Sequence, residues 1–308
     1  MAPSNEPIDD LLEWHPGTPE AATTNVLRAL AWGARRAAGA KLLIFFLWLA
    51  YALVAAGGGT ALLDAARTRA TLGDAVARVI ENTTAGRPPA GSPARAAYRA
   101  LLLDSLTRQP WVPTGYFVLF YGLLAGGAIA HLHAPRPAPL LAQLGATSGT
   151  YAGRFARLLA VAWATTTLLL AAGSLLPLGE GGTASAATQV ALLVASLAVV
   201  AAIIDYARVR TVARDSRSMV LELARSARFF VRNLPRTLAL ELLLLAVSAA
   251  IGLLAFAAGA ALATVTSART AAFVAAQLLV LGLLWQRLTA WGAMLALYQG
   301  LALRRLSR

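Results

Sequence analysis

Long blocks of apolar residues set the tightest limit on how this chain can fold. Six blocks approach or exceed the roughly 20 apolar residues that a helix needs to cross a bilayer. A backbone inside a bilayer must satisfy its own hydrogen bonds, so such blocks form helices. We therefore predict an all-α, polytopic membrane protein with six transmembrane helices. The predicted spans are 42–63, 116–132, 158–178, 188–204, 238–264 and a last one that begins near 271 and runs to about 284 or on towards 303.

The composition argues against several classes of protein. Apolar residues make up 58% of the chain and charged residues 13%, whereas a soluble domain has about 45–50% and about 25%. The chain has no cysteine, which excludes disulfides, zinc–thiolate sites and thiol nucleophiles. It has three histidines, no acidic cluster and no recognisable nucleotide or hydrolase motif. We therefore predict a non-enzymatic protein with no catalytic residue, no metal and no cofactor.

The basic residues predict the orientation of the spans. The formal net charge is +13, and arginine makes up all of the 27 basic residues except Lys41. With six spans the two termini share a side, and that side carries 19 basic residues against eight on the other. Because basic residues concentrate in cytoplasmic loops, both termini are predicted to be cytoplasmic. The Arg-rich, Lys-poor composition suggests a GC-rich bacterial genome, so we expect a bacterial inner membrane.

The other segments divide into tails and loops. Residues 1–27 are polar and acidic, without the basic start and early apolar stretch of a signal peptide, and predict a cytoplasmic tail. The six-helix domain covers 28–303. It includes a helical periplasmic loop at 64–115 and a cytoplasmic loop with an amphipathic helix at 205–237. Residues 304–308 form a basic C-terminal tail.

The cytoplasmic segment 216–234 has an amphipathic helical pattern. At 100° per residue its apolar side chains gather on one side and its arginines on the other. This pattern is typical of a helix in the membrane interface, where each arginine near an anionic leaflet contributes about 1 kcal/mol. Alternatively, the helix packs on neighbouring loops with solvated arginines. The arginines are Arg217, Arg225, Arg228 and Arg232, and the apolar residues are Met219, Val220, Leu223, Ala227, Phe230, Val231 and Leu234.

The order of the spans and two short motifs resemble a known family. The fourth span is followed by Asp205-Tyr206-Ala207-Arg208-Val209-Arg210 and then by Asp215-Ser216-Arg217-Ser218, the amphipathic helix and Pro235. Over about 115–303 this resembles uncharacterised bacterial six-span membrane proteins with an Asp-Tyr-Ala-Arg-x-Arg motif. The layout is more weakly similar to the membrane domain of bacterial glycerophosphodiester phosphodiesterases, whose catalytic domain is absent here. The resemblance implies the six-span fold and no known reaction.

The motif residues have a structural and a functional interpretation. Asp205 follows a span, where a bare carboxylate is costly, and Arg208 lies one helical turn away. We predict an Asp205–Arg208 ion pair, and a partner for Asp215 in Arg214 or in an arginine of another loop. Together these pairs would fix the turn into the amphipathic helix. Alternatively, the motif holds a lipid phosphate or a partner protein. The arginines for that role are Arg208, Arg210 and Arg217.

Four polar residues lie within the last two spans: Glu241, Gln277, Gln286 and Arg287. Arg287 is about 24 Å along the helix from Ala271, so it reaches the cytoplasmic boundary, and the rest of the helix would be interfacial or cytoplasmic. We expect Glu241 to lie near the interface and to pair with Arg236 or Arg287. Alternatively, Glu241 and Arg287 belong to an ion or proton path.

Glycines in the spans predict close contacts between helices. The candidates are Gly122 and Gly126 in the second span and Gly252 and Gly259 in the fifth.

These patterns predict an accessory subunit of a membrane complex, or an envelope scaffold. Its arginine-rich cytoplasmic face would contact anionic lipid of the inner leaflet or an acidic partner protein. No recognition pattern for nucleic acid accompanies the arginines. The alternative is a transporter or lipid-handling protein with a cavity between its helices.

Overall fold

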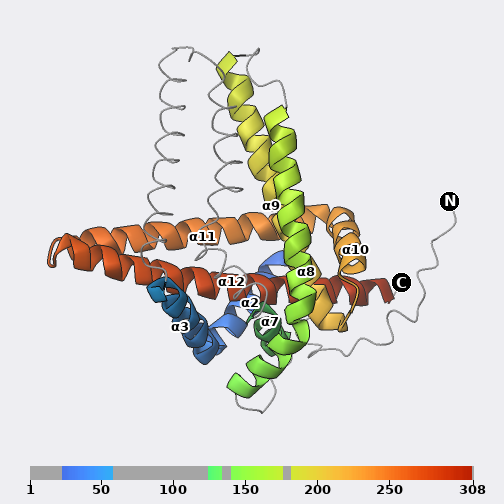
Figure 1. Ribbon diagram of the computed structural model, residues 1–308, viewed down its shortest axis with the longest axis horizontal. Helices are drawn as coiled ribbons and strands as arrows, with labels where there is room; N and C mark the ends of the chain where they lie inside the picture. The colour runs from blue at the N-terminus through green and yellow to red at the C-terminus, as the bar shows by residue number, and fades with distance from the viewer. Residues whose placement is uncertain (1–22, 58–123, 134–139, 176–181, 307–308) are drawn as a thin grey trace. The chain divides into compact units, whose positions relative to one another are not determined.

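The computed structural model describes residues 23–57, 124–133, 140–175 and 182–306 (Figure 1). Within these ranges the regular structure is helical and there is no strand, so the prediction of an all-α fold is confirmed. The predicted periplasmic loop 64–115 and most of the N-terminal tail lie outside the described residues. The described helices are α2 (Val26–Gly39), α3 (Lys41–Gly57), α7 (Ala125–His133), α8 (Leu140–Leu175), α9 (Gly182–Arg214), α10 (Met219–Arg232), α11 (Leu234–Ala263) and α12 (Ala268–Leu306).

The chain divides into two compact units. The first contains residues 1–50, 122–155 and 203–308, and the second contains 51–121 and 156–202. The second unit includes the C-terminal part of α8 and the N-terminal part of α9. All of the predicted site residues belong to the first unit.

Two of the described helices are long and apolar enough to cross a membrane. They are α11 and the 270–304 part of α12. A third candidate is the pair formed by α2 and the start of α3, which meet at a bend of 74°. The part of the chain that the structure describes thus offers two or three candidate spans, fewer than the six predicted. Parts of the predicted second and third spans, 116–123 and 176–178, lie outside it.

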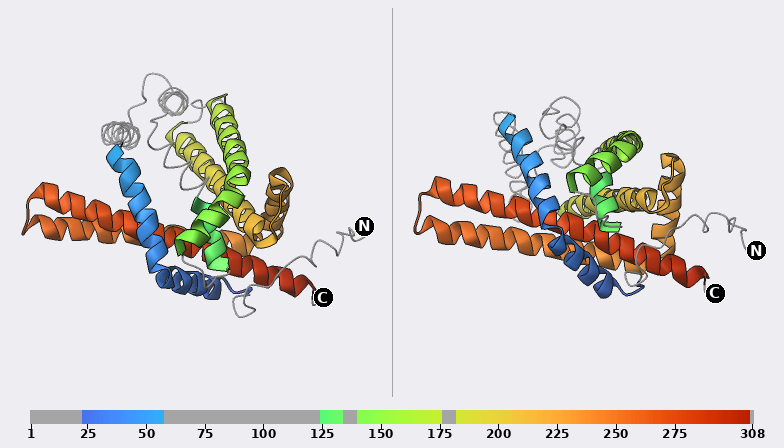
Figure 2. Two further views of the ribbon diagram at one scale, coloured as in Figure 1. Left: turned by 60° about the horizontal axis from the view of Figure 1, so that its bottom comes forward. Right: turned by 90° about the horizontal axis from the view of Figure 1, so that it is seen from below.

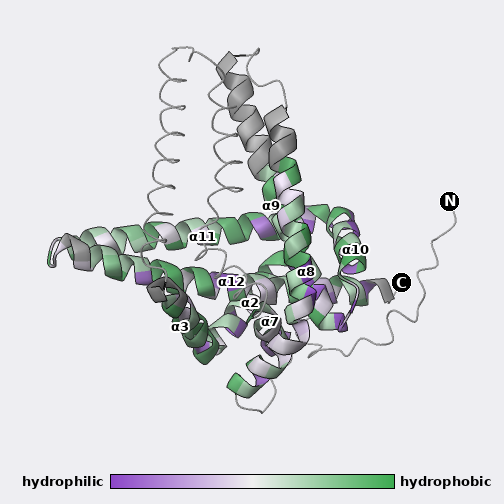
Figure 3. Cartoon of the chain, in the orientation of Figure 1, coloured by the Kyte–Doolittle hydropathy of each residue, from purple (hydrophilic) through white to green (hydrophobic). Residues whose placement is uncertain are grey.

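The pair α11 and α12 carries an apolar surface that water would not cover favourably. The two helices lie side by side in both views of Figure 2, and most of α11 is hydrophobic in Figure 3. Leu253, Phe256 and Phe273 are 69%, 76% and 64% exposed. Exposed apolar patches of this extent mark contact with lipid or with another protein. The surface therefore agrees with membrane association of this pair.

Glycines bring α11 and α12 together at two positions. A methyl group on Gly259 would lie 2.9 Å from the Ala275 Cβ, and one on Gly282 would lie 2.5 Å from the Ile251 side chain. The predicted close contact at Gly259 is confirmed, whereas Gly282 had not been predicted. The prediction for Gly252 is wrong for the part of the chain that the structure describes, because no atom of a neighbouring helix there lies within 4 Å of a methyl group placed on that residue.

The C-terminal half of α12 forms the core of the first unit. Every residue from Leu288 to Leu301 is buried, because α2, α7 and α11 all pack on this helix. We expected this stretch to lie at an interface or in the cytoplasm, but neighbouring helices cover it. A helix of 39 residues is about 58 Å long, which is nearly twice the hydrocarbon core of a bilayer. The apolar character of its second half therefore serves packing against the other helices.

The contact between α2 and α12 depends on a pair of glycines. A methyl group on Gly292 would lie 2.9 Å from the Gly33 Cα, and one on Gly33 would lie 2.6 Å from the Ala293 backbone nitrogen. The two backbones touch, which is possible only where neither residue has a side chain. The N-terminal end of α2 is fixed by Asn25, whose side chain accepts a hydrogen bond from the Arg28 amide.

Candidate functional site

The turn between α9 and α10 orients the motif predicted from the sequence. Asp215 has a φ of 48°, in the left-handed region that Asp tolerates better than most residues. Ser218 is extended, and α10 begins at Met219. The chain thus reverses within four residues, which packs α10 against the end of α9.

Asp205 accepts hydrogen bonds from two arginines on two helices. The Arg208 Nη1 lies 2.7 Å and the Arg287 Nη2 2.5 Å from the same Asp205 Oδ1. The Asp205 side chain is 5% exposed and that of Arg208 is 4% exposed. The predicted Asp205–Arg208 ion pair is confirmed. The pair with Arg287 was not predicted, because no local spacing links α9 to α12.

Glu241 does not take the partner that the sequence suggested. Its predicted partners were Arg236 and Arg287, but Arg287 binds Asp205. Within the described residues Glu241 forms no ion pair, and its buried Oε1 has no hydrogen-bond donor. The prediction of a Glu241 ion pair is therefore wrong.

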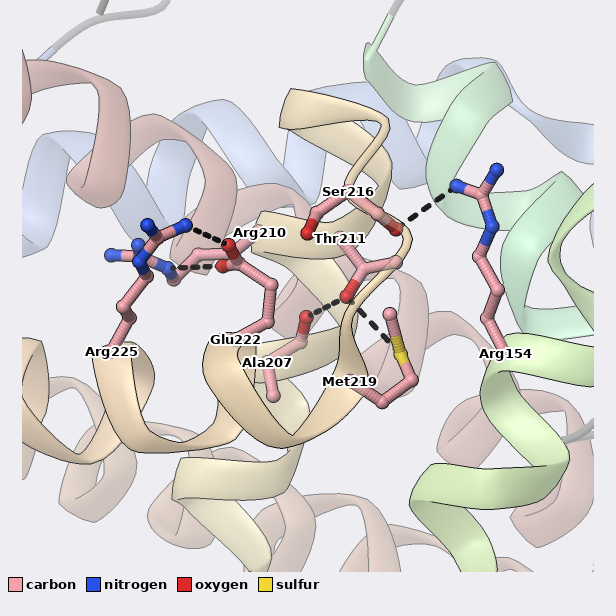
Figure 4. Close-up of polar contacts among 8 residues, drawn as sticks. All are labelled: Arg154, Ala207, Arg210, Thr211, Ser216, Met219, Glu222 and Arg225. Carbon is pink, nitrogen blue, oxygen red and sulfur yellow. Dashed lines mark hydrogen bonds and ion pairs between the residues drawn. The ribbon is translucent and has the colours of Figure 1, made fainter. Parts of the chain in front are cut away.

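Glu222 is the centre of a second buried charge cluster. Its carboxylate accepts a 3.0 Å hydrogen bond from the Arg210 Nε and another of 3.0 Å from the Arg225 Nη1 (Figure 4). The Glu222 side chain is 0% exposed. Sequence reasoning missed Glu222, although its spacing of three residues from Arg225 was a usable signal. A pair of arginines on one buried carboxylate is a strong structural contact while both donors are present.

Aromatic rings surround this second cluster. The Arg210 guanidinium lies 5.0 Å from the centroid of the Tyr298 ring, which meets Phe229 edge to face. Tyr206 packs on Phe229 and Phe230 from α10 and is fully buried. Burial raises the pKa of the Tyr206 hydroxyl well above its ordinary value, so it stays protonated.

Several residues predicted to contact lipid or a partner are therefore covered by the protein. Tyr206, Arg208 and Arg210 are buried. The two arginines bind carboxylates, and the Tyr206 ring packs on Phe229. These contacts of the three side chains are with other residues of the protein. Binding of a headgroup or a partner by Arg208, Arg210 and Arg217 stays a prediction.

Asp215 pairs with an arginine of another loop, as predicted. The Arg154 Nη1 on α8 lies 2.6 Å from the Asp215 Oδ1. The same nitrogen donates a 3.0 Å hydrogen bond to the Ser216 carbonyl (Figure 4). The Asp215 side chain is 71% exposed. Water competes for this pair, so it positions the turn at little gain in stability.

The helix α10 has three faces rather than the two predicted. One face is buried and consists of Met219, Glu222, Ser226, Phe229 and Phe230. The second is apolar but exposed: Val220 is 73% and Val231 67% exposed, with Ala224 between them. The third carries the arginines. Arg228 and Arg232 are exposed there, as is Arg217 before the helix, whereas Arg225 is half-buried against Glu222.

The two glutamines of the predicted last span bind neighbouring helices. The Trp48 Nε1 on α3 donates a 2.9 Å hydrogen bond to the Gln277 Oε1 on α12. The Gln286 Nε2 donates to the Leu244 carbonyl on α11 over 3.5 Å. Both side chains therefore connect helices of the first unit. In the described ranges no three acidic or histidine side chains gather in a way that could hold a metal ion.

No protein-family model, curated protein or solved structure matches the chain. The resemblance to six-span membrane proteins therefore stays a prediction from the motifs.

Proposed function

We propose that the chain is a six-span, non-enzymatic protein of a bacterial inner membrane, with both termini in the cytoplasm. It acts as an accessory subunit or scaffold whose helix α10 rests on the anionic cytoplasmic leaflet. The observation that carries the proposal is the exposed apolar face of α10 beside exposed arginines, at the end of a helix long enough to cross a membrane. The buried ion pair between Arg210 and Glu222 attaches α10 to the end of α9.

The position of α10 supports contact with a leaflet. Only Asn233 separates α10 from α11, with Pro235 in the first turn of α11. If α11 crosses the bilayer, α10 must end at the bilayer surface, where α11 begins. Figure 1 shows α10 turning away from the direction of α11, within the first unit. A helix at that depth meets acyl chains on one side and phosphates on the other.

The two exposed faces of α10 match those two environments. On a helical wheel Val220, Ala224 and Val231 lie within about 40° of one another, and Arg228 and Arg232 follow about 90° further round. The apolar face favours lipid over an acidic protein partner. An acidic protein would match the arginines but would leave the valines uncovered.

Spin labels on the full-length protein test this proposal, since the chain has no cysteine to replace. The label would be attached after Val231→Cys, with Leu221→Cys as the matched control on the arginine side of the same helix. In nanodiscs containing anionic lipid we expect the label at 231 to collide with oxygen more than with a water-soluble nickel chelate. The label at 221 should show the reverse preference.

Lipid composition separates the two candidate partners. Arg228→Gln together with Arg232→Gln should make the label at 231 more accessible to water in anionic nanodiscs. In neutral nanodiscs the same two changes should increase this accessibility by a smaller amount. A label at 231 that is water-accessible in both lipid compositions would contradict contact with the leaflet.

A further inference from the structure

One carboxyl oxygen of Glu241 is shielded from water and accepts no hydrogen bond from the described residues, although it lies beside a cluster of buried charges. Its Oε1 is buried and has no hydrogen-bond partner in the described part of the chain. A negative charge on such an oxygen is strongly unfavourable unless a cation or a donor reaches it. Protonation removes this charge.

The groups that face Glu241 come from two helices. Asp205 and Tyr206 on α9 and Arg287 on α12 interact electrostatically with its carboxyl group. Asp205 repels a negative charge there, and Arg287 attracts it. However, the Arg287 Nη2 and the Arg208 Nη1 both donate to Asp205. In this arrangement one terminal nitrogen of each arginine is bound to Asp205 and not to Glu241.

We propose that Glu241 is a proton-binding site. Its carboxyl group holds a proton while Arg287 is bound to Asp205. When the proton leaves to water, the carboxylate attracts Arg287, and Asp205 keeps Arg208 as its partner. The Arg287 side chain is 23% exposed, so the cluster has contact with the surface through which a proton can exchange. No oxidant, reductant or second substrate is needed.

A proton fits this site better than a metal cation does. Two arginines lie on the neighbouring carboxylate and repel a second positive ion. A proton forms a covalent O–H bond and needs no shell of several oxygen ligands, which a metal ion requires.

Proton binding is coupled to the attachment of α9 to α12. The Asp205–Arg287 contact joins these helices across 82 positions of sequence. Loss of the proton draws Arg287 towards α11 and weakens this contact. The proposal concerns a different surface from the α10 lipid contact and stands independently of it.

Glu222 provides a matched control within the same unit. It is 0% exposed, but each of its oxygens accepts a hydrogen bond from an arginine. Glu222 thus has the hydrogen-bond donors that the Glu241 Oε1 lacks. Both glutamates are buried, so the comparison separates the effect of burial from the effect of a missing donor.

Infrared difference spectroscopy of the full-length protein in nanodiscs tests the proposal. Spectra taken at neutral and at alkaline pH should differ in the carbonyl band of a protonated carboxyl group. Glutamates in water have a pKa of about 4.3 and contribute no such band over this range. Labelling glutamate with carbon-13 in the wild-type protein should shift the band, and labelling aspartate should not. Glu241→Gln should remove it, and Glu222→Gln should keep it.

The neighbours of Glu241 should move the midpoint of this titration in opposite directions. Arg287→Gln removes the attracting charge and should raise the pH at which the band disappears. Asp205→Asn removes the repulsion and frees Arg287, so it should lower that pH. The absence of a glutamate-derived band in the folded wild type would overturn the proposal, even if no variant folds. A band that survives Glu241→Gln would overturn it as well.

Discussion

The carboxylate of Asp205 and the guanidinium of Arg287 meet at 2.5 Å, although 82 positions separate them in the sequence. Arg208, one turn after Asp205, donates to the same oxygen at 2.7 Å. One buried carboxylate therefore binds an arginine of its own helix, α9, and an arginine of α12. The contact lies where α12 changes from an exposed apolar helix to a fully buried one.

Removing the charge of Asp205 should destabilise the fold far more than removing that of Asp215. Asp205→Asn leaves two arginines on a buried amide, and loss of one partner of a buried ion pair costs about 3–5 kcal/mol. Asp215→Asn breaks a pair whose acid is 71% exposed, which is worth about 0–1 kcal/mol. The apparent melting temperatures of both variants in detergent would measure the difference. Equal decreases in melting temperature would contradict the claim that the buried ion pair contributes more to stability than the exposed one.

Glu222→Gln should also lower stability, by about 3–5 kcal/mol, because Arg210 then stays buried without a counter-charge. Arg232→Gln, on the exposed side of the same helix, should change stability by less than about 0.5 kcal/mol. A double variant with Arg210→Gln should lose less than the sum of the two single losses, because both remove one interaction. Circular dichroism during heating measures the stability of the three single variants, Glu222→Gln, Arg210→Gln and Arg232→Gln, and of the double variant. Strict additivity would exclude a direct Glu222–Arg210 contact.

Gly33→Ala should disrupt the packing of α2 on α12. The new methyl group would lie 2.6 Å from the Ala293 nitrogen, and a backbone atom of a buried helix has little room to move. Overpacking of this kind costs about 1–3 kcal/mol. Gly39→Ala in the same helix meets nothing within 4 Å and should be neutral or slightly stabilising. The melting temperatures of Gly33→Ala and Gly39→Ala check the prediction. Equal melting temperatures for the two variants would contradict it.

The proposed topology predicts the behaviour of fusion reporters. Alkaline phosphatase, which is active only outside the cytoplasm, should stay inactive when fused to either terminus of the full-length chain. A reporter that fluoresces only in the cytoplasm should be active at both ends. The physical reason is the excess of arginine on that side of the spans. Phosphatase activity at one terminus would show an odd number of spans.

The sequence by itself determined the helical class, the apolar helices of the C-terminal part and the Asp205–Arg208 pair. Each of these depends on residues close in the chain. Apolar blocks form helices wherever the backbone must satisfy its own hydrogen bonds, and a spacing of three places two side chains on one helix face.

Only the tertiary structure decided the partners that lie far apart. Arg287 binds Asp205 rather than Glu241, and Glu222 is buried between two arginines. The amphipathic pattern of α10 separated apolar from basic residues, but the residues facing the protein proved to include a glutamate and a serine. The second half of α12 is covered because α2 meets it at Gly33 and Gly292. A neighbouring helix decides whether an apolar or charged side chain faces lipid, water or protein, and periodicity within one helix does not contain that information.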